Sequence, residues 1–561
     1  MFGFFSKRAG KPSKKIQVVS VLNKLSAQSG GVTRVAMARA DILSRRDLRS
    51  LIATLDYDPI IFDSIATLRA DTRLGSGVGV LNFFIYYAIL SASAGKKLLI
   101  KDYYVGLNDG VLNRQSRYVG LTEFRSTEYS DVNGRVFARE LVGSDGHVVS
   151  FQLEVPDREV LVFGTRDDAC THWLNEVSNF GKASLLIADS STKSGVVASV
   201  SARKARKILT LHGNHLASPY KFGSDVKPLS MGIIGSARSA DAFVLLTVAQ
   251  ANDVSKQFPY VKNLYVIPNS VDACPSSSID RSIKTFVVVS RLESVKNVAM
   301  VIRAFRIAVD IDSELRLEIW GHGSQMDALD RLIVKLGLSD YAQLKGYVNP
   351  VSEKFFGARA SLSASVSEGF GLSILESMSC GCPVIALASN YGPVEIVKNG
   401  LNGYLVENEQ QMADRITQLA NDDALFKDLA SGSLKTAQSH DADMIGDRWV
   451  TLVKDLTDPS WQGYKSKRSK TLKNSRSSIG GNILFTSHAS QKLDDFRRVE
   501  IIRVNRKRML NGVACLIEPG VYSIKLLERD EKGGVLLKFS QGKNVYQGIV
   551  PNGSIEFRLL S

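Results

Sequence analysis

The chain has 561 residues, of which 44% are hydrophobic. That is enough for roughly three or four domains, each with a hydrophobic core of its own. Lysine and arginine outnumber aspartate and glutamate by 71 to 56, which gives a net charge of +15. Such a charge indicates an anionic partner and carries no information about the fold. Five cysteines in so long a chain exclude a disulfide framework, so we expect free thiols, with Cys380 and Cys382 packed at a helix end.

No segment of the sequence predicts secretion or a membrane span. The apolar run MFGFF at the N-terminus is too short for a signal peptide. Residues 74–95 lack charged side chains, but their strongly apolar part, residues 78–90, is shorter than the about 20 residues that a spanning helix needs. We therefore expect a buried helix there, and a protein of the reducing cytoplasm.

The first half of the chain alternates apolar strands with helices. KKIQVVSVL predicts a strand and VTRVAMARADIL a helix, with the Gly30-Gly31 turn between them. Further apolar runs predict strands of the same sheet, at residues 97–101, 184–188, 207–211, 242–246 and 264–267. This alternation predicts a parallel sheet covered by helices, in which ligands bind beyond the carboxyl ends of the strands.

Residues 102–165 interrupt the alternation. They contain several tyrosines, alternating runs such as VVSFQLEV, and turn signals at Asn133-Gly134 and Asp145-Gly146. A crossover between parallel strands does not need so many strands of its own. The segment is therefore predicted to be a β-rich insertion.

The second half repeats the αβ plan and places two cations after its first strand. Residues 285–289 form that apolar strand, and Arg291 and Lys296 follow it closely. Arginine can clasp phosphate oxygens with two donors and lysine supplies a point charge, so the pair suits a diphosphate. A solvated loop is the competing interpretation. The next strand, residues 315–320, leads into the glycine-containing loop WGHGS.

A Gly-Phe-Gly turn between two glutamates is the most informative motif. Residues 367–383 read SEGFGLSILESMSCGCP, with Glu368 before the turn and Glu376 after it. Gly369 and Gly371 let the backbone approach a bound group closely. The helix that follows directs free N–H donors at the same place, so it can hold an anion. The ligand would therefore carry phosphates, and beside them hydroxyl groups that donate hydrogen bonds to the two carboxylates. A nucleotide sugar has both.

Part of this motif also has an interpretation without a ligand. Ser373 and Glu376 have the S-x-x-E spacing of a capping box, in which both side chains bond to the backbone at the start of a helix. For Glu376 the two interpretations are about equally strong.

In this order, R-x4-K after a strand, WGHGS after the next and the double-glutamate element resemble family 4 of the retaining glycosyltransferases. The resemblance extends from about Lys15 to Leu456. The runs TLHGNH, DAFVLLTVAQANDVSKQF and YVIPNSVD are similar to the subgroup that glycosylates wall teichoic acids and serine-rich surface adhesins. Members of that subgroup carry a β-rich insertion in the N-terminal domain.

The resemblance implies an α/β protein of the GT-B fold, with two facing Rossmann-like domains and the β-rich insertion. Beyond it, runs such as GVYSIKLLE and GGVLLKF predict a small C-terminal β module. The expected parts are a basic tail (1–14), an N-terminal acceptor domain (15–270), a nucleotide-sugar-binding domain (271–460), a basic linker (461–482) and the β module (483–561).

The resemblance also implies roles for single residues. Glu368 would hold hydroxyls of the donor sugar, Glu376 those of the ribose, and Tyr347 would lie at the base. His212 matches the family's histidine beside donor sugar and acceptor, although a histidine at a strand end is more often structural. The predicted catalytic residues are His212, Arg291, Lys296 and Glu368, and the predicted donor site consists of Gly30, Gly31, Arg291, Lys296, Tyr347, Glu368, Gly369, Phe370, Gly371, Leu372 and Glu376.

The reaction implied is retaining transfer of glucose or N-acetylglucosamine from a UDP-sugar. Because Arg291 and Lys296 would neutralise the leaving diphosphate, we predict that neither a metal nor another cofactor is needed. The sequence Asp310-Ile-Asp312 resembles a metal motif only superficially, and we expect both carboxylates to be solvated at a helix end.

Three functions remain open from sequence. The acceptor is either a wall teichoic acid, a poly(glycerol or ribitol phosphate), or a Ser/Thr-rich adhesin, and the third reading is a non-catalytic partner subunit. The charge favours the anionic polymer. Basic side chains gather in the tail and in the linker, at Lys465, Lys467, Arg468 and Lys470. They also leave open a peripheral contact with an anionic membrane. No motif indicates nucleic acid, and a homo-oligomer is open.

Overall fold

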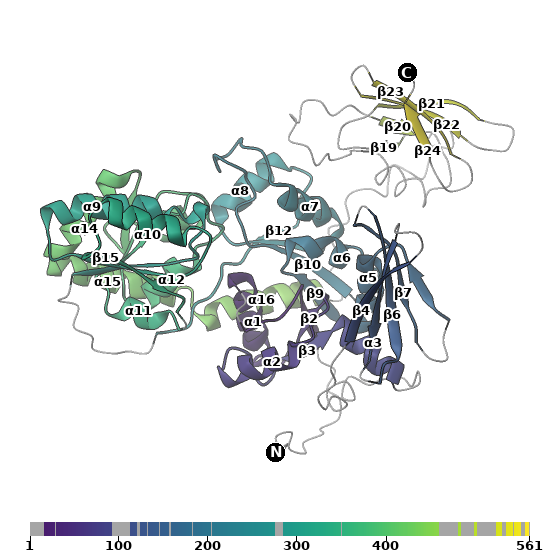
Figure 1. Ribbon diagram of the computed structural model, residues 1–561, viewed down its shortest axis with the longest axis horizontal. Coiled ribbons are helices and arrows are strands. Elements are labelled where there is room, and N and C mark those ends of the chain that lie inside the picture. Colours follow the sequence, from purple (N-terminus) through teal and green to yellow (C-terminus); the bar gives the residue numbers. More distant parts are fainter. Residues whose placement is uncertain are drawn as a thin grey trace, which may run out of the picture. The chain divides into compact units, whose positions relative to one another are not determined.

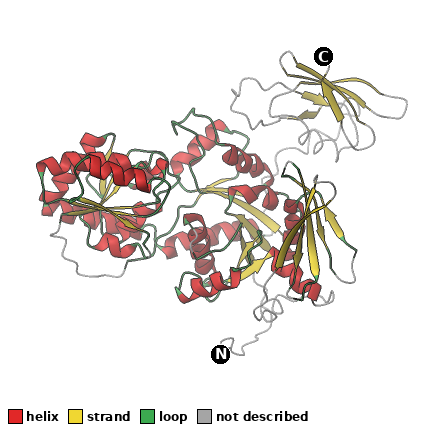
Figure 2. Ribbon diagram, in the orientation of Figure 1, coloured by secondary structure: helices red, strands yellow, loops and turns green. Residues whose placement is uncertain are grey.

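The computed structural model describes residues 16–458 except 28–29, 93–112, 120–123, 132, 145, 156–158, 182, 204, 275–283 and 349; beyond residue 458 it describes only strands. Two compact units divide the chain, and nearly all described residues belong to the first. The first unit contains two parallel sheets, each covered by helices (Figures 1 and 2).

The N-terminal sheet has seven parallel strands in the order β12-β11-β10-β9-β1-β2-β3. Its strands are β1 (Gln17–Leu22), β2 (Arg49–Thr54), β3 (Gly79–Asn82), β9 (Ser184–Ala188), β10 (Ala205–Leu211), β11 (Ala242–Leu245) and β12 (Leu264–Val266). Every residue of β1 and β9 is buried, as expected for central strands with helices on both faces. The helices are α1 (Gly31–Ser44), α2 (Ile61–Ala70), α3 (Phe83–Ala92), α5 (Arg166–Ser178), α6 (Ser194–Ala198), α7 (Pro228–Ser236) and α8 (Val248–Gln257), with 3-10 turns η1 (Ser191–Lys193) and η2 (Ala237–Ser239).

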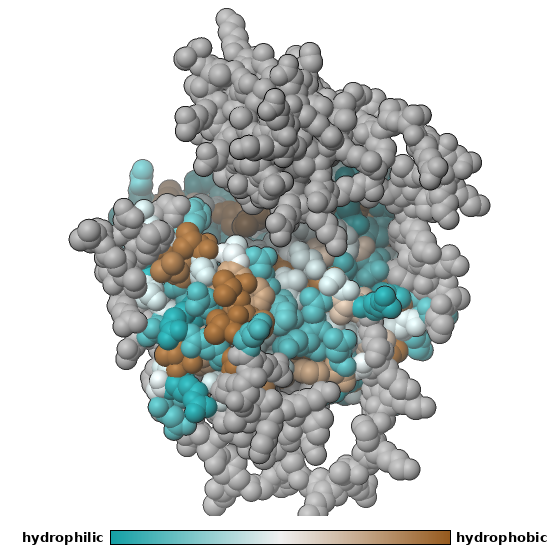
Figure 3. Space-filling model, turned by 90° about the vertical axis from the view of Figure 1, so that its right-hand side faces the viewer, coloured by the Kyte–Doolittle hydropathy of each residue, from teal (hydrophilic) through white to brown (hydrophobic). Residues whose placement is uncertain are grey.

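The β-rich insertion is confirmed as an antiparallel sheet between α3 and α5. Its strands are β4 (Asn113–Val119), β5 (Phe124–Ser130), β6 (Val136–Gly143), β7 (Val148–Leu153) and β8 (Leu161–Phe163), paired in chain order. Aromatic rings attach it to the domain: Phe151 contacts Phe83 of α3 at 5.9 Å between ring centroids, and Phe83 contacts Trp173 of α5 at 5.8 Å. The sheet also exposes apolar side chains, Val149, Val160 and Val162. On the face shown in Figure 3, apolar patches alternate with polar ones.

The C-terminal sheet has six parallel strands in the order β15-β14-β13-β16-β17-β18. They are β13 (Thr285–Val289), β14 (Arg316–Trp320), β15 (Ala342–Gly346), β16 (Ala360–Ser363), β17 (Val384–Leu387) and β18 (Gly403–Val406). Strand β13 lies in the middle of this sheet, so the loop that follows it lies at the middle of the edge formed by the carboxyl ends of the strands. The helices are α9 (Val298–Ile311), α10 (Met326–Lys335), α11 (Ser352–Phe356), α12 (Leu372–Ser379), α13 (Gly392–Ile396), α14 (Glu409–Asn421), α15 (Asp423–Gln438) and α16 (Ala442–Thr457), with the 3-10 turn η3 (Ser294–Lys296).

The last helix of this half returns to the first domain. In α16, Ile445, Trp449 and Leu452 share a core with Val18 of β1 and Ile208 of β10. The two halves are thus joined by the chain itself and also by burial of apolar surface.

Beyond residue 458 the strands form two antiparallel sheets. One pairs β19 (Gly481–Ile483) with β20 (Val499–Ile501), and the other contains β21 (Ser523–Arg529), β22 (Val535–Gln541), β23 (Asn544–Val550) and β24 (Glu556–Leu559). The predicted C-terminal β module is thus confirmed as a β structure. The basic side chains predicted in the tail and the linker lie outside the described residues.

Two further expectations from sequence have different outcomes. The buried helix expected at residues 78–90 is confirmed only in part, because Gly79–Asn82 form strand β3 and the largely buried helix α3 is Phe83–Ala92. The strand expected at residues 97–101 lies outside the described residues. Among the described residues no helix combines the length and the apolar character that crossing a membrane requires. The expectation of free thiols is wrong for one pair, because Cys274, between the two domains, forms a disulfide with Cys380 at the end of α12, with their Cα atoms 5.2 Å apart. Cys382 is free and buried.

Candidate active site

Lys296 and Glu368 meet at the carboxyl edge of the C-terminal sheet. Lys296 ends η3 in the loop after β13, and Glu368 lies in the loop after β16. The Lys296 ammonium forms an ion pair with the Glu368 carboxylate, and both side chains are largely shielded, with 17% and 15% exposed. Arg291 lies in the same loop as Lys296 with its side chain exposed. The structure therefore places a predicted phosphate-binding cation against a predicted sugar-binding carboxylate.

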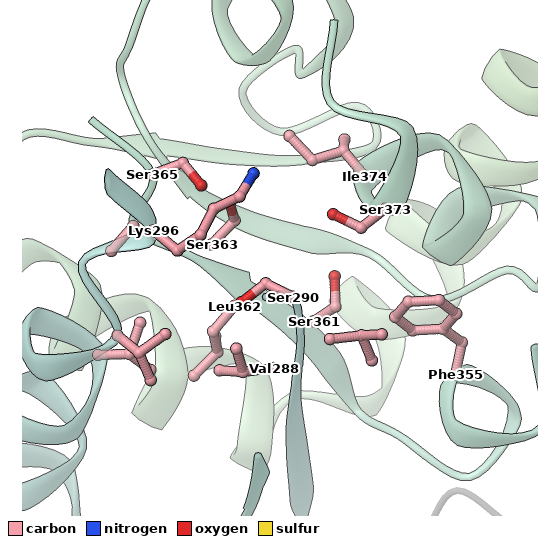
Figure 4. A pocket seen from close by; sticks show the side chains of 14 residues that line it. Val288, Ser290, Lys296, Phe355, Ser361, Leu362, Ser363, Ser365, Ser373 and Ile374 are labelled. Atoms are coloured by element: carbon pink, nitrogen blue, oxygen red, sulfur yellow. The ribbon is translucent and has the colours of Figure 1, made fainter. Parts of the chain in front are cut away.

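Lys296 lines a pocket that is rich in hydroxyl groups (Figure 4). The Ser290 hydroxyl is buried there and has no hydrogen-bond partner among the described residues. Hydroxyls that can donate, grouped around one ammonium, make a suitable surface for phosphate oxygens. Five serines contribute, Ser290, Ser361, Ser363, Ser365 and Ser373.

We did not predict these serines, although the sequence contains a signal for them. In ASLSASVS, residues 360–367, every second residue is serine. Along a strand, side chains two apart lie on the same face. The alternation therefore indicated a hydroxyl-bearing face that leads directly to Glu368.

Helices α12 and α1 both begin with a glycine turn, and the two turns approach each other. The turn before α12 ends at Gly371, whose φ of 91° is left-handed and favours glycine. A Cβ atom on Gly31, at the start of α1, would lie 3.3 Å from Cδ1 of Leu372. No side chain caps either helix, so the first N–H groups of both can bind an anion. Two positive helix ends thus converge from the two domains.

The capping-box interpretation of Glu376 is wrong. The N-cap of α12 is Gly371, which places Ser373 inside the helix rather than at the cap. The Glu376 carboxylate instead forms an ion pair with Arg34 of α1, at 3.0 Å. Arg34 was not predicted, because nothing in its own neighbourhood of the sequence connects it to Glu376.

His212 lies at the carboxyl end of β10, against the Gly-Phe-Gly turn. A Cβ atom on Gly369 would lie 2.0 Å from the carbonyl oxygen of His212, so only glycine fits. Phe370, predicted in the donor site, has a buried side chain in an apolar cluster with Leu246 and Ile374. Its side chain therefore anchors the turn, and only its backbone is left to face a ligand.

Asp189, which we did not predict, fixes the other side of His212. Its Oδ1 lies 3.0 Å from His212 Nε2 and 2.9 Å from Nη1 of Arg39 in α1. Burial alone would raise the pKa of the Asp189 carboxyl, but Arg39 and the hydrogen bond from His212 hold that pKa below its usual range. Asp189 is therefore a buried carboxylate ion.

The remaining loops of the C-terminal edge also meet at the site. Tyr347 follows β15 and is 69% exposed. A Cβ atom on Gly321 would lie 1.8 Å from the carbonyl oxygen of Ser290, and one on Gly323 would lie 2.5 Å from that of Leu292. The glycines of WGHGS thus let this loop pack directly on the loop that carries Arg291.

A second set of contacts fastens the domains beside the site. Glu395 of α13 accepts hydrogen bonds from the N–H groups of Val248 and Ala249, at 3.0 and 3.1 Å, and so caps α8 of the first domain. The Tyr391 hydroxyl donates to Asp253 of α8 at 2.9 Å, and its ring stacks on His215. His215 is fully buried, so its role is structural.

The described residues offer no group of three or more His, Cys, Asp or Glu side chains that could hold a metal ion. Asp310 forms an ion pair with Arg306. The expectation that Asp312 is solvated is wrong, because Lys284 binds its carboxylate at 2.7 Å and the side chain is only 11% exposed.

The two-domain architecture is shared with solved glycosyltransferase structures. Staphylococcus aureus TarM, solved as a G117R mutant with fondaparinux, alpha-GlcNAc-glycerol and UDP, superposes with a TM-score of 0.63 at 21% identity. The alignment covers 78% of this chain and 99% of TarM. Residues 275–435 match the family described as Glycosyl transferases group 1. The chain is therefore a glycosyltransferase of the GT-B fold.

Three curated relatives are similar in sequence. The poly(ribitol-phosphate) alpha-N-acetylglucosaminyltransferase of Staphylococcus aureus is 24% identical, over 78% of this chain and 99% of that protein. The poly(glycerol-phosphate) alpha-glucosyltransferase of Bacillus subtilis is 23% identical over 57% of this chain. The third relative is the GtfA subunit of the UDP-N-acetylglucosamine–peptide N-acetylglucosaminyltransferase of Streptococcus gordonii. It is 28% identical over 49% of this chain. The chain spans about half the length of the last two relatives, 49% and 57%.

Proposed function

We propose that this chain is a retaining family 4 glycosyltransferase that moves glucose or N-acetylglucosamine from a UDP-sugar to hydroxyls of a wall teichoic acid chain. One observation carries the proposal. The uncapped N-terminus of α12 borders the serine pocket that Lys296 lines, and the uncapped N-terminus of α1 packs against Leu372 of α12. Glu368 lies before the glycine turn and Glu376 lies within α12. Positive charge flanked by two carboxylates suits a diphosphate that joins a sugar to a ribose.

The donor would enter by exchanging partners with the existing ion pairs. The diphosphate takes the Lys296 ammonium, with Arg291 beside it, and Glu368 then accepts hydrogen bonds from the sugar hydroxyls. On the other side, the ribose hydroxyls take the place of Arg34 on Glu376. Each carboxylate stays hydrogen-bonded throughout, which avoids the cost of a bare buried charge.

Catalysis then consists of stabilising the departing diphosphate. The acceptor oxygen bonds to the anomeric carbon as the bond from that carbon to the diphosphate breaks, and the hydroxyl proton passes to the departing diphosphate. Attack and departure occur on the same face, which retains the anomeric configuration. Lys296, Arg291 and the N–H groups of α12 and α1 are already in place for the charge that develops, so little reorganisation is needed. Because these groups neutralise the leaving group, the reaction proceeds without a divalent metal.

A teichoic acid acceptor is favoured by charge and by the relatives. The chain carries a net charge of +15, which suits a polyanion. One relative, matched over 99% of its length, is an enzyme named for poly(ribitol phosphate). The GtfA relative is named for a peptide acceptor, so a Ser/Thr-rich protein is the second candidate. The setting we propose is the cytoplasm, where UDP-sugars are made.

The first test is a donor panel. The purified chain is incubated with UDP-glucose, UDP-N-acetylglucosamine and their GDP and ADP counterparts, and release of the free nucleotide is measured. We expect turnover with a UDP-sugar and its loss in Lys296→Ala. Absence of turnover with every nucleotide sugar, with and without acceptor, would contradict the proposal and favour a non-catalytic partner subunit.

A further inference from the structure

Asp189 and Arg39 form a buried ion pair, and His212 forms a hydrogen bond with the Asp189 carboxylate. Asp189 follows β9 and His212 follows β10, and these strands are parallel neighbours. Their side chains therefore meet at the carboxyl edge of the sheet. The Asp189 side chain is fully buried and that of Arg39 is 3% exposed.

Arg39 is itself held from several directions. Its Nη1 donates to Asp189 at 2.9 Å and its Nη2 to Ser20 at 2.7 Å. The Trp449 ring of α16 covers the guanidinium at 4.8 Å. Arg39, which belongs to α1, is thus held in one position by contacts with β1, the end of β9 and α16. Because the Asp189 carboxylate is fixed with it, the His212 ring has little freedom.

We propose that Asp189, which is held by both terminal nitrogens of Arg39, is a positioning residue that selects the tautomer of His212. This inference rests on the proposed function, because it assigns His212 a hydroxyl of the bound sugar or acceptor as its partner. A carboxylate ion can only accept hydrogen bonds. His212 Nε2 must therefore carry the hydrogen, which leaves Nδ1 as the ring nitrogen that accepts.

The backbone of His212 is constrained as well. Its carbonyl oxygen packs on Gly369 of the donor-side turn. With the ring fixed by Asp189 and the backbone by Gly369, His212 presents one acceptor nitrogen in one orientation. A sugar hydroxyl that must donate to it is then oriented without reorganisation of the protein.

A purely structural pair is available for comparison in the same domain. Glu140 of the insertion is 2% exposed and binds Arg166 of α5, with the Tyr129 hydroxyl donating to it at 2.9 Å. The Glu140 carboxylate is nearly as buried as that of Asp189, although Arg166 is 29% exposed. Its described hydrogen-bond partners are Tyr129 and Arg166 rather than a histidine. Glu140→Gln is therefore a matched control for loss of a buried carboxylate ion.

The test is a double-mutant cycle on transfer. Asp189→Asn keeps the shape, but Arg39 donates to both carboxylate oxygens of Asp189 and His212 contacts one of them, so the NH2 group of asparagine must face a donor in either orientation. We expect Asp189→Asn to lower kcat by about 10²-fold, the effect of a small misplacement at a reacting group, with the affinity for UDP unchanged. Adding it to His212→Ala should cost nothing further, because Asp189 acts through His212. In the control, the effects of Glu140→Gln and His212→Ala should multiply. Losses from Asp189→Asn and His212→Ala that multiply would overturn the proposal.

A measurement without substrate separates this inference from the proposed function. Imidazole ¹⁵N NMR of histidine-labelled protein, assigned with His212→Ala, reports which ring nitrogen carries the hydrogen. We expect Nε2–H in the wild type and loss of this state in Asp189→Asn. Nδ1–H in the wild type would overturn the inference even if transfer occurs. Nε2–H together with no transfer from any UDP-sugar would support the inference on the tautomer while contradicting the proposed function.

Discussion

Gly369 and His212 pack backbone against backbone across the two domains. A Cβ atom at Gly369 would lie 2.0 Å from the His212 carbonyl oxygen and 2.8 Å from Cα of Gly213. No backbone shift confined to one loop relieves such an overlap, because the Gly-Phe-Gly turn is anchored by buried Phe370. The contact therefore sets how closely the donor-side turn can approach the histidine.

We predict that Gly369→Ala separates these two parts and lowers kcat by about 10²-fold, the cost of misplacing a reacting group. Most of the proposed nucleotide-binding residues belong to the C-terminal domain, so UDP affinity should fall much less than kcat. Gly357→Ala is the control, since a Cβ there meets no atom within 4 Å. Steady-state kinetics and calorimetric UDP titration check both variants. Wild-type kcat in Gly369→Ala would show that close approach is not needed.

Removal of the cations should disable turnover. We expect Arg291→Ala and Lys296→Ala each to lower kcat by about 10²–10³-fold, the usual effect of losing one donor to a developing negative charge. Lys335→Ala, an exposed lysine in the last turn of α10, is the control for loss of charge alone. Circular dichroism confirms folding. A variant at Arg291 or Lys296 that keeps more than about a third of wild-type kcat would refute its role in stabilising the leaving group.

Glu376 should be responsible for recognising ribose. We compare the affinities for UDP and 2′-deoxy-UDP in the wild type and in Glu376→Ala. Hydrogen bonds to a charged group contribute about 1.5–3 kcal/mol, so the wild type should prefer UDP by at least about tenfold. The variant should bind the two alike, and Glu407→Ala, an exposed glutamate, should keep the preference. A preference that survives in Glu376→Ala would assign the ribose to another residue.

The features predictable from sequence were those with a local signature. Strand and helix periodicity, the glycine turns and the Arg291–Lys296 spacing each lie within a few neighbouring residues. Arg34, Asp189 and Arg39 were missed because their partners, Glu376 and His212, are distant in sequence and become neighbours only through the fold. The Cys274–Cys380 disulfide, with a separation of 106 residues, was missed for the same reason. A motif also does not reveal which of its side chains turn toward the core, as that of Phe370 does.

Activity should not depend on a divalent metal. Side chains and helix N–H groups supply the positive charge that a metal would otherwise bring to the diphosphate. We therefore expect full rates in excess EDTA. Rates lost on chelation and restored by added Mg²⁺ or Mn²⁺ would contradict this prediction.

Salt should distinguish the two substrates. Attraction between exposed charges weakens as the screening length falls from about 10 Å at 0.1 M to about 3 Å at 1 M. We expect added NaCl to raise KM for a polyanionic acceptor far more than KM for the UDP-sugar, whose charges are partly enclosed. Neutralising Lys465, Lys467, Arg468 and Lys470 should reproduce part of the effect. Equal sensitivity of both KM values would leave the net positive charge unrelated to the acceptor.

The most direct measurement is the transfer itself. The purified chain is incubated with UDP-glucose or UDP-N-acetylglucosamine and, separately, with poly(ribitol phosphate), poly(glycerol phosphate) and a Ser/Thr-rich peptide, and the products are examined by NMR. We predict a sugar on the hydroxyls of a polyol phosphate chain, with the coupling constant of the α-anomer. Efficient glycosylation of the peptide with unmodified polymers would contradict the teichoic acid assignment, and a β-linked product would contradict retention.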